Sequence, residues 1–272
     1  MNKLDLTILI PCAADERIRY CIQSIYDTCE ENVEILVSLN KASKKVREIL
    51  KNFPEVKICE IKENNLSKAY NNGIRHASRN NILLMDSDCV FSKNTIKLLY
   101  SGLKYGKFSK GLPIFKYDNL ISKVISKVRE YTTTDFINAY SPPLVFSKDI
   151  KNLIGGYYFH EQIPWSEDNE FNYRIQNTQL KIFYNPKAII YHDPLTIKQD
   201  VTSGFRYGKG RKVAEELGLL PKTNFFQPST CAKKFAKTYE VLCKKGLFPA
   251  LYYFFIWQPA NRIGYIVQAF SI

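Results

Sequence analysis

Two aspartates follow a short apolar run in the first half of the sequence. Residues 82 to 85 are apolar, have polar residues before them, and lead directly into Asp86-Ser87-Asp88. This arrangement is typical of a buried strand that ends at a tight turn. Carboxylates two residues apart repel each other, and burying them unpaired is costly. The pair therefore indicates a cation at this turn, although a solvated turn after a strand would also fit these residues.

A second acidic pair, Glu167 and Asp168, follows Ser166 in the segment "PWSEDNEF". Serine is a common helix N-cap, so the segment predicts a helix with both carboxylates in its first turn, where the helix dipole stabilises anions. Because adjacent helical positions face different directions, we expect only one carboxylate to reach a shared ligand. The pair would also fit a role confined to starting the helix.

Strands and helices alternate through the first hundred residues. Apolar and β-rich runs predict strands, and 3.6-residue periodicity predicts the helices between them. The predicted strands are 6–11, 33–39, 56–61 and 82–85, and the predicted helices are 15–29, 42–53 and 66–77. Such alternation indicates βαβ units and a parallel sheet. The expected fold class is therefore α/β.

The polar ends of these strands predict a ligand site. Open parallel sheets bind ligands beyond the carboxyl ends of their strands, where residues 11–13, 38–40 and 86–88 would meet. A nucleotide is the expected ligand. Neither a G-x-G-x-x-G after the first strand nor a G-x-x-x-x-G-K-[ST] is present, which argues against the usual dinucleotide and P-loop sites.

The pattern changes after residue 105. Short strands are predicted at 111–116, 143–147 and 181–191, and helices at 118–130, 148–154 and 167–178. From residue 200 onward the chain is predicted to be helical and basic.

Composition narrows the choice of partners. The 272 residues are 45% hydrophobic, and 39 Lys and Arg against 26 Asp and Glu give a net charge of +13. This balance favours an anionic partner such as nucleic acid, lipid headgroups or a phosphorylated substrate, although it could serve solubility alone. Seven scattered cysteines without a C-x-x-C pair argue against a zinc site and fit reduced thiols in a cytosol.

Five segments, in order, resemble the family 2 glycosyltransferases. They are "LTILIPCAADERIRYCIQSI", "NNLSKAYNNGIRHASRNNILLMDSD", "PWSEDNEFNYRI", "FYNPKAIIYHDP" and "FRYGKGR", within residues 5 to 215. The resemblance implies the GT-A fold, a Rossmann-like mixed sheet flanked by helices. It implies a GT-A domain at 1–215, with a nucleotide-binding half at 1–105 and an acceptor half at 106–215, followed by a helical extension at 216–272. It also implies inverting transfer of a sugar from a nucleotide-diphosphate sugar to an acceptor hydroxyl.

The same resemblance gives the acidic residues their roles. Mn²⁺ or Mg²⁺, which prefer oxygen ligands, would bridge carboxylate and diphosphate. Asp88 would be the direct ligand, and Asp86 a second ligand or a contact to the sugar or ribose. His192, at the end of a predicted strand, would be a third ligand or contact the diphosphate, or would be structural. Asp168 would be the catalytic base, while Glu167 would hold the acceptor or neighbouring polar groups.

Further donor contacts are expected from the loops around the sheet. Arginine offers a planar fork for phosphate. Asn40 stands where many relatives carry an aspartate, and because its amide can both donate and accept hydrogen bonds, the identity of the nucleotide base is not predicted. Trp165 would stack on the sugar or pack in the core, and a solvated helix face would equally explain the basic residues. The expected nucleotide-sugar-binding residues are Pro11, Cys12, Ala13, Asn40, Lys68, Asn72, Asp86, Ser87, Trp165, Arg206, Lys209 and Arg211.

The apolar segment "GLFPALYYFFIW", residues 246 to 257, is too short to cross a bilayer, and no run reaches ~18 apolar residues. Lys244, Lys245 and Arg262 flank it, and Trp257 and Tyr265 suit an interface. These features predict peripheral docking on the anionic cytoplasmic face of a membrane, beside a lipid-linked or nascent glycan acceptor. Packing on the domain or a homodimer interface would also fit.

Two other functions compete with this reading. A sugar-phosphate nucleotidyltransferase would need a glycine-rich phosphate loop after the first strand, and "PCAADERIR" contains no glycine. A non-catalytic binder of nucleotide-sugar or nucleic acid would fit the basic charge, but no nucleic-acid recognition motif accompanies it, so we expect no nucleic-acid partner.

Overall fold

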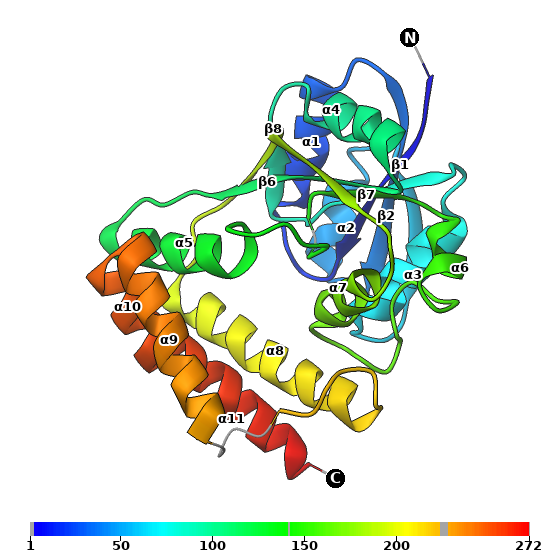
Figure 1. The fold of residues 1–272 in the computed structure, drawn as a ribbon. Coiled ribbons are helices and arrows are strands. Elements are labelled where there is room, and N and C mark those ends of the chain that lie inside the picture. The colour runs from blue at the N-terminus through cyan, green and yellow to red at the C-terminus, as the bar shows by residue number, and fades with distance from the viewer. Residues whose placement is uncertain (1–2, 141, 224–227, 272) are drawn as a thin grey trace. The chain divides into compact units, whose positions relative to one another are not determined.

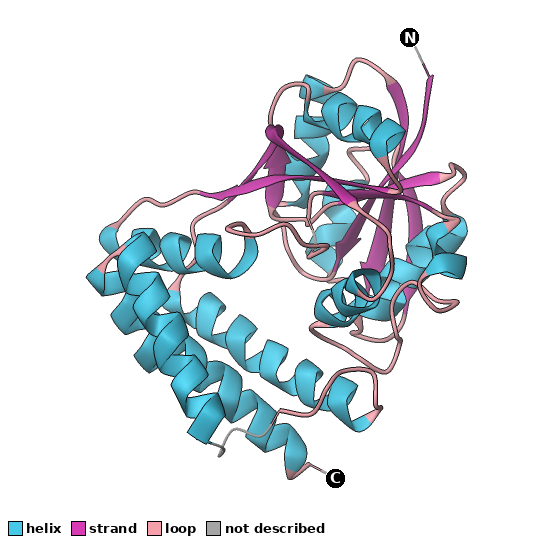
Figure 2. Ribbon diagram, viewed as in Figure 1, coloured by secondary structure: helices cyan, strands magenta, loops and turns pink. Residues whose placement is uncertain are grey.

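The computed structural model describes residues 3–140, 142–223 and 228–271. The chain divides into two compact units, Met1–Ile114 with Ile137–His192, and Phe115–Phe136 with Asp193–Ile272 (Figure 1). The first unit contains the sheet, and the second is helical (Figure 2).

The first unit is built on one mixed sheet. Its strands are β1 (Lys3–Cys12), β2 (Asn32–Asn40), β3 (Lys57–Ile61), β4 (Asn81–Leu84), β5 (Cys89–Phe91), β6 (Phe108–Phe115), β7 (Leu144–Ser147) and β8 (Ile182–His192). They lie in the order β3-β2-β1-β4-β7-β6-β8-β5. The first four are parallel, whereas β7 is antiparallel to β4 and β6, and β5 is antiparallel to β8.

Helices cover both faces of this sheet. They are α1 (Ile18–Thr28), α2 (Lys44–Leu50), α3 (Leu66–His76), α4 (Thr95–Gly102), α6 (Ile150–Leu153) and α7 (Glu167–Gln176), with a 3₁₀ turn at Leu103–Tyr105. One core lies between the sheet and α1, α2 and α4, and the other between the sheet and α3, α6 and α7. Alternate residues of β1 serve the two cores, because successive strand side chains point to opposite faces. The predicted α/β sheet flanked by helices is confirmed.

Two elements near residue 88, a strand and a helix, were not predicted from the sequence. The strand β5 is only three residues long, and α4 follows it directly. Residues 89 to 91 pair with 190 to 192 of β8, so the chain just after Asp88 meets the end of a strand a hundred residues later. Short strands of this kind carry too little periodicity to be read from sequence.

A buried carboxylate secures the opposite edge of the sheet, where β1 and β2 begin. Glu34, on β2, accepts hydrogen bonds from Thr7 (2.5 Å), Lys57 (2.6 Å) and both the amide and hydroxyl of Ser78 (2.7 and 2.8 Å). Burial opposes ionisation, but these donors, Lys57 first, lower the pKa of Glu34 to about 2. The carboxylate therefore ties three strands to the loop that precedes β4.

The second unit packs its helices through small residues. The elements are α5 (Leu120–Thr133), α8 (Ile197–Glu216), α9 (Pro228–Lys245), α10 (Leu247–Tyr252), a π-helical segment η2 (Tyr253–Trp257) and α11 (Gln258–Ala269). A Cβ on Gly208 of α8 would lie 1.9 Å from the Asn261 carbonyl oxygen of α11, so only glycine permits this crossing. Because α8 packs on α11, the compact units do not divide at residue 215, where the sequence prediction ended the first domain.

Buried polar contacts fix the core of the second unit. Arg129 of α5 donates to Asp200 of α8 at 2.6 Å, and the Tyr252 hydroxyl donates to the other oxygen of Asp200 at 2.7 Å. The Arg129 guanidinium also lies 4.4 Å from the centre of the Trp257 ring. Trp257 is thus buried and structural, and its predicted placement at a membrane interface is wrong. Tyr265 likewise donates inward, to Glu215 at 2.6 Å.

Within the described residues, no helix is long and apolar enough to cross a bilayer.

Replacing Glu34 with Gln should lower the free energy of unfolding by about 1–3 kcal/mol at pH 7, because the amide cannot satisfy four donors. The pKa of Glu34 is depressed by folding, so its stabilising effect is full above the ordinary value of 4.5 and disappears as the pH falls to about 2. Urea unfolding of both proteins across this range tests the prediction. Glu60→Gln, which removes an exposed partner of Arg47, is the control and should have a smaller effect. A difference that persists unchanged at pH 2 would contradict it.

Candidate active site

The Asp86-Ser87-Asp88 turn lies at the carboxyl end of β4, in the middle of the sheet. The amide of Cys89 donates to the Asp86 carbonyl at 3.3 Å and closes the turn. Cys89 then pairs with His192, the last residue of β8. This register brings the Nε2 atom of His192 to 3.2 Å from the Oδ2 atom of Asp88.

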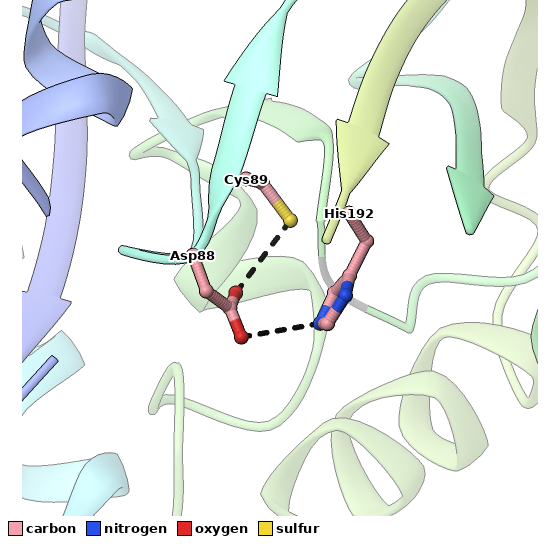
Figure 3. Close-up of side chains that lie close together, drawn as sticks. All are labelled: Asp88, Cys89 and His192. Atoms are coloured by element: carbon pink, nitrogen blue, oxygen red, sulfur yellow. Dashed lines mark hydrogen bonds and ion pairs between the residues drawn. The ribbon is translucent and has the colours of Figure 1, made fainter. Parts of the chain in front are cut away.

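Three potential ligand atoms converge beside this turn. Those of Asp88, Cys89 and His192 lie within 4.8 Å of one another, and Figure 3 shows the carboxylate facing the imidazole. Burial raises the pKa of the Cys89 thiol well above its ordinary value, so the thiol keeps its proton and donates to Asp88 at 3.7 Å. The carboxylate and imidazole are a donor pair suited to Mn²⁺ or a similar divalent ion.

Asp86 does not join this group of close ligand atoms among the residues that the structure describes. Its Oδ1 atom accepts a hydrogen bond from the Tyr70 hydroxyl of α3 at 3.5 Å. Burial, and then the negative charge of Asp88, raise the pKa of Asp86 to about 7. The two aspartates of one turn are therefore held in different electrostatic environments, and a contact with the sugar or ribose suits Asp86 better than direct metal ligation.

Asp88 is the carboxylate that stays ionised. Burial opposes its charge, but His192 and then Arg17 lower its pKa to about 2. The Nη2 atom of Arg17 lies 3.3 Å from the same Oδ2 atom that faces His192. Arg17 was missed in the sequence, where it is one charge in the acidic and basic run "ADERIR".

Lys110 is a buried cation that links the Asp86-Ser87-Asp88 turn, a DXD motif and hereafter the DXD turn, to the second acidic pair. Its ammonium group donates to the carbonyls of Tyr140 and Pro142, the latter at 3.3 Å. Burial lowers its pKa to about 7, while the charges of Asp168 and Asp86 favour its protonated form. A lone lysine in the strand "FSKGLPIF" was the signal for it in the sequence. Asp86 and Asp168 therefore lie around one lysine, in a shared electrostatic cluster.

The two acidic residues at the start of α7 differ in burial and in pKa. Glu167 is almost fully buried, and burial followed by the charge of Asp168 raises its pKa well above the ordinary value. Asp168 is partly exposed, and burial raises its pKa to about 6 although Lys110 opposes the shift. Near neutral pH, Asp168 is thus a carboxylate that can take up a proton, whereas burial favours the protonated form of Glu167.

The start of α7 differs from the prediction for Ser166. Ser166 does occupy the N-cap position, but it has a left-handed backbone (φ 66°) and its side chain caps no helical amide. Its carbonyl instead accepts a hydrogen bond from the amide of Asn169 at 3.2 Å. Left-handed backbone is uncommon outside glycine, and here it occurs directly before the two candidate catalytic carboxylates.

The loop that leads into Glu167 is secured from two helices. Arg174 of α7 donates to the carbonyls of residues 154 and 157 at 2.6 and 2.9 Å, and also to that of Tyr158. From α3, Asn71 exchanges two hydrogen bonds with the Phe159 backbone, and Ser67 donates to the Ile163 carbonyl at 2.5 Å. These contacts hold the candidate base in place relative to α3.

The loops after β1 and β2 are tied to each other and to α3. The amide of Ser43 donates to the Ala13 carbonyl at 2.8 Å, and the Asn65 amide donates to the side chain of the buried Asn40 at 2.7 Å. Pro11 and Cys12 are buried beside them. Burial raises the pKa of Cys12 to about 11, so this thiol is neutral. The predicted base contacts of these residues stay predictions.

Four more predicted donor residues lie in the first unit. Lys68 pairs with Glu63 at 2.8 Å on the surface, and Asn72 is buried beside Cys59. Ser87 is the middle residue of the DXD turn, and Trp165 is half-buried before α7. Their contacts with a donor also stay predictions.

The three basic residues predicted to cover the phosphates lie on α8, in the second unit. Arg211 donates there to Glu215 at 2.8 Å and to Thr223 at 2.9 Å, a structural role within that unit. The phosphate contacts of Arg206, Lys209 and Arg211 stay predictions.

Comparison with known proteins gives the family that part of the chain resembles. The family model described as glycosyl transferase family 2 matches residues 7–138. The resemblance expected from the sequence is confirmed over this segment, which includes β1 from Thr7 onward, the DXD turn and Lys110.

Among curated proteins, the chain is similar to the glycosyltransferase GlyA of Streptococcus pneumoniae serotype 4 (strain ATCC BAA-334 / TIGR4). They are 25% identical over 207 residues, which cover 68% of this chain and 30% of GlyA. The chain thus spans about a third of the length of that relative.

Solved structures share the fold. The mannosyltransferase PcManGT from Pyrobaculum calidifontis, in complex with GDP-Man and Mn²⁺, has a TM-score of 0.63 at 13% identity and covers 100% of this chain and 88% of its own. S. aureus TarS 1–349, in complex with UDP-GlcNAc, has a TM-score of 0.55 at 14% identity and covers 99% and 91%. These similarities confirm the predicted GT-A-like fold.

The Asp88 carboxylate and the His192 imidazole are the two candidate metal ligands, and removing either should weaken Mn²⁺ binding. We expect Asp88→Asn and His192→Gln each to lower the affinity at least about tenfold, because each removes one of the two suitable ligands. Electron paramagnetic resonance of free Mn²⁺ gives the binding curve. His76→Gln, at an exposed histidine bonded to the Asn72 carbonyl, is the matched control. Unchanged Mn²⁺ binding by Asp88→Asn would contradict the assignment.

Proposed function

We propose that the chain is an inverting glycosyltransferase that moves a sugar from a nucleotide-diphosphate sugar to an acceptor hydroxyl. The observation that carries the proposal is the clustering of Asp86, Asp88 and Asp168 around Lys110 and His192, in a chain with a family 2 segment. Similar structures were solved with GDP-Man and Mn²⁺ or with UDP-GlcNAc, which supports a nucleotide-sugar donor.

Asp88 and His192 would hold a divalent ion, Mn²⁺ or Mg²⁺. When bound, the ion would supply positive charge that stabilises the departing nucleoside diphosphate. Asp86, with its raised pKa and its bond to Tyr70, would contact the sugar or ribose. The buried loops after β1 and β2 would hold the base by backbone contacts, and Arg206, Lys209 and Arg211 would approach the phosphates from α8.

Asp168 would act as the catalytic base. Above pH 6 its carboxylate can accept the proton of the acceptor hydroxyl as that oxygen attacks the anomeric carbon, opposite the diphosphate. Glu167, whose protonated form is favoured by burial, would hydrogen-bond to the acceptor or to a neighbouring polar group. Arg174 and Asn71, which secure the preceding loop, would fix the distance between base and donor.

Slow hydrolysis, in which water replaces the acceptor hydroxyl and nucleoside diphosphate is released, tests the function on a panel of UDP-, GDP- and dTDP-sugars with and without Mn²⁺. We expect release that Mn²⁺ stimulates and that falls below a midpoint near pH 6, because Asp168 must be deprotonated. Asp168→Asn should lower the rate about 10²- to 10⁴-fold and remove this acid limb.

Asp149→Asn, at an exposed residue paired with Lys107, is the control and should behave as wild type. Absence of release from every sugar nucleotide by the wild type would contradict the function. Full activity of Asp168→Asn would contradict the role of the base alone.

We propose further that the acceptor is lipid-linked or part of a surface glycan, and that the second unit docks on the anionic cytoplasmic face of a membrane. Large apolar side chains are exposed along α9, α10 and η2, and this α9–η2 surface comprises Phe235, Tyr239, Leu247, Phe248 and Phe255. Lys233, Lys234 and Lys237 lie on the same helix as Phe235, and Lys234 lies over the Phe254 ring at 4.2 Å. Aromatic side chains interleaved with lysines match the headgroup region of an anionic bilayer.

Lys245 does not contribute to that surface as the sequence prediction implied, since it pairs with Glu130 and Asp135 at 3.2 and 2.9 Å.

Flotation with vesicles tests the docking. The double variant Phe248→Ser with Phe255→Ser should lose most of the binding to phosphatidylglycerol vesicles, because both rings are about two-thirds exposed and replacing them leaves the core intact. Binding to phosphatidylcholine vesicles should be weaker for both proteins. Ile58→Ser, at an exposed apolar residue of β3, is the control. Equal recovery of the wild type and the double variant would contradict docking, and concentration-dependent dimerisation that the double variant abolishes would indicate a homodimer interface instead.

A further inference from the structure

One oxygen of Asp88 faces both a histidine and an arginine. Its Oδ2 atom lies 3.2 Å from His192 Nε2 and 3.3 Å from Arg17 Nη2. Arg17 ends the loop between β1 and α1, directly before Ile18. A basic residue from the first strand connection is thus brought against the DXD carboxylate, 71 residues further along the chain.

Asp15 fixes the guanidinium in this position. The Nε and Nη2 atoms of Arg17 donate to the two oxygens of Asp15 at 2.9 and 2.6 Å, a bidentate arrangement. The backbone amide of Arg17 donates to the same carboxylate at 3.0 Å. Arg17 and Asp88 are both only about a quarter exposed, so solvent screens their interaction incompletely. Asp15 therefore holds the Arg17 guanidinium in position for its contact with Asp88.

The position of Arg17 conflicts with a divalent ion at Asp88. Asp88 Oδ2 belongs to the candidate metal ligands with His192, and an ion there would stand close to the guanidinium, where like charges repel. His192 can remain, because a neutral imidazole is a ligand. Arg17 cannot deprotonate, so it must move away from Asp88 or hold the ion out.

We infer that Arg17 is an exchangeable counter-ion that neutralises Asp88 until a divalent ion binds and then transfers to the diphosphate of the donor. This rests on the proposed function, since it takes the donor to be a nucleotide-diphosphate sugar. The arginine fork, oriented by Asp15 at the carboxyl end of β1, suits two phosphate oxygens. Arg17 is therefore a diphosphate-binding residue as well as a competitor of the metal ion.

Two opposite effects of one substitution follow. In Arg17→Ala, Mn²⁺ should bind at least about threefold more tightly in the absence of nucleotide, because a competing cation is gone. Nucleoside diphosphate should bind about tenfold more weakly at saturating Mn²⁺, because a charge-assisted contact is lost. Arg17→Lys should keep most of the competition with Mn²⁺ and lose part of the diphosphate affinity, since lysine lacks the fork.

Arg19→Ala is the matched control. It removes the same charge two residues away, from an exposed side chain that stacks on the Tyr20 ring. Mn²⁺ is titrated alone by electron paramagnetic resonance, and UDP and GDP are then titrated by calorimetry in saturating Mn²⁺. We expect Arg19→Ala to match the wild type in both titrations.

Each outcome decides the inference. Tighter Mn²⁺ binding together with weaker diphosphate binding in Arg17→Ala alone supports it. Unchanged or weaker Mn²⁺ binding in Arg17→Ala, unchanged diphosphate binding, or equal changes in Arg19→Ala would overturn it. A wild type that binds neither Mn²⁺ nor any nucleoside diphosphate would overturn the proposed function itself, which keeps the two failures distinct.

Discussion

Repulsion among carboxylates at one rim of the sheet is the constraint on which the first unit depends. Asp86, Asp88, Glu167 and Asp168 come from two distant segments, and burial makes their charges costly. The neighbouring charges differ from one carboxylate to the next, so their pKa values differ. Asp88 stays ionised beside Arg17 and His192, whereas Asp86 and Asp168 lie near Lys110 with raised pKa values. Burial also raises the pKa of Glu167. Different protonation states on neighbouring carboxylates allow one site to hold a cation and also accept a proton.

The secondary structure keeps these groups together. The pairing of β5 with β8 brings His192 to Asp88, and β6 carries Lys110 between β7 and β8. Gly111 permits this close approach, because a Cβ there would lie 2.3 Å from the Ala188 carbonyl of β8. Arg174, Asn71 and Ser67 then hold the loop before α7 through backbone carbonyls and amides. A polar framework of this kind permits only small movements of the candidate base relative to α3.

Local patterns were sufficient to predict most of the sheet and the two acidic pairs. Strong periodicity marked the predicted strands up to 85, and "DSD" and "SED" stood at element ends where polar side chains gather. The pairing of β5 with β8 could not be predicted from the sequence, because a three-residue strand has no recognisable hydrophobic periodicity and its partner lies about a hundred residues away. Ser166 has the composition of an N-cap but a left-handed backbone, which depends on the loop before it. Arg17 and Trp257 show the same limit: their roles depend on partners far away in sequence, Asp88 for one and Arg129 for the other.

The most direct test of the shared acidic cluster is a crystal structure of the full chain with Mn²⁺ and either UDP or GDP, using anomalous scattering to locate the metal. We expect one Mn²⁺ peak within about 2.5 Å of both Asp88 and His192, in contact with the diphosphate, with Asp168 on the same side of the sheet. A diphosphate bound elsewhere on the chain, or a metal peak remote from Asp88, would contradict it.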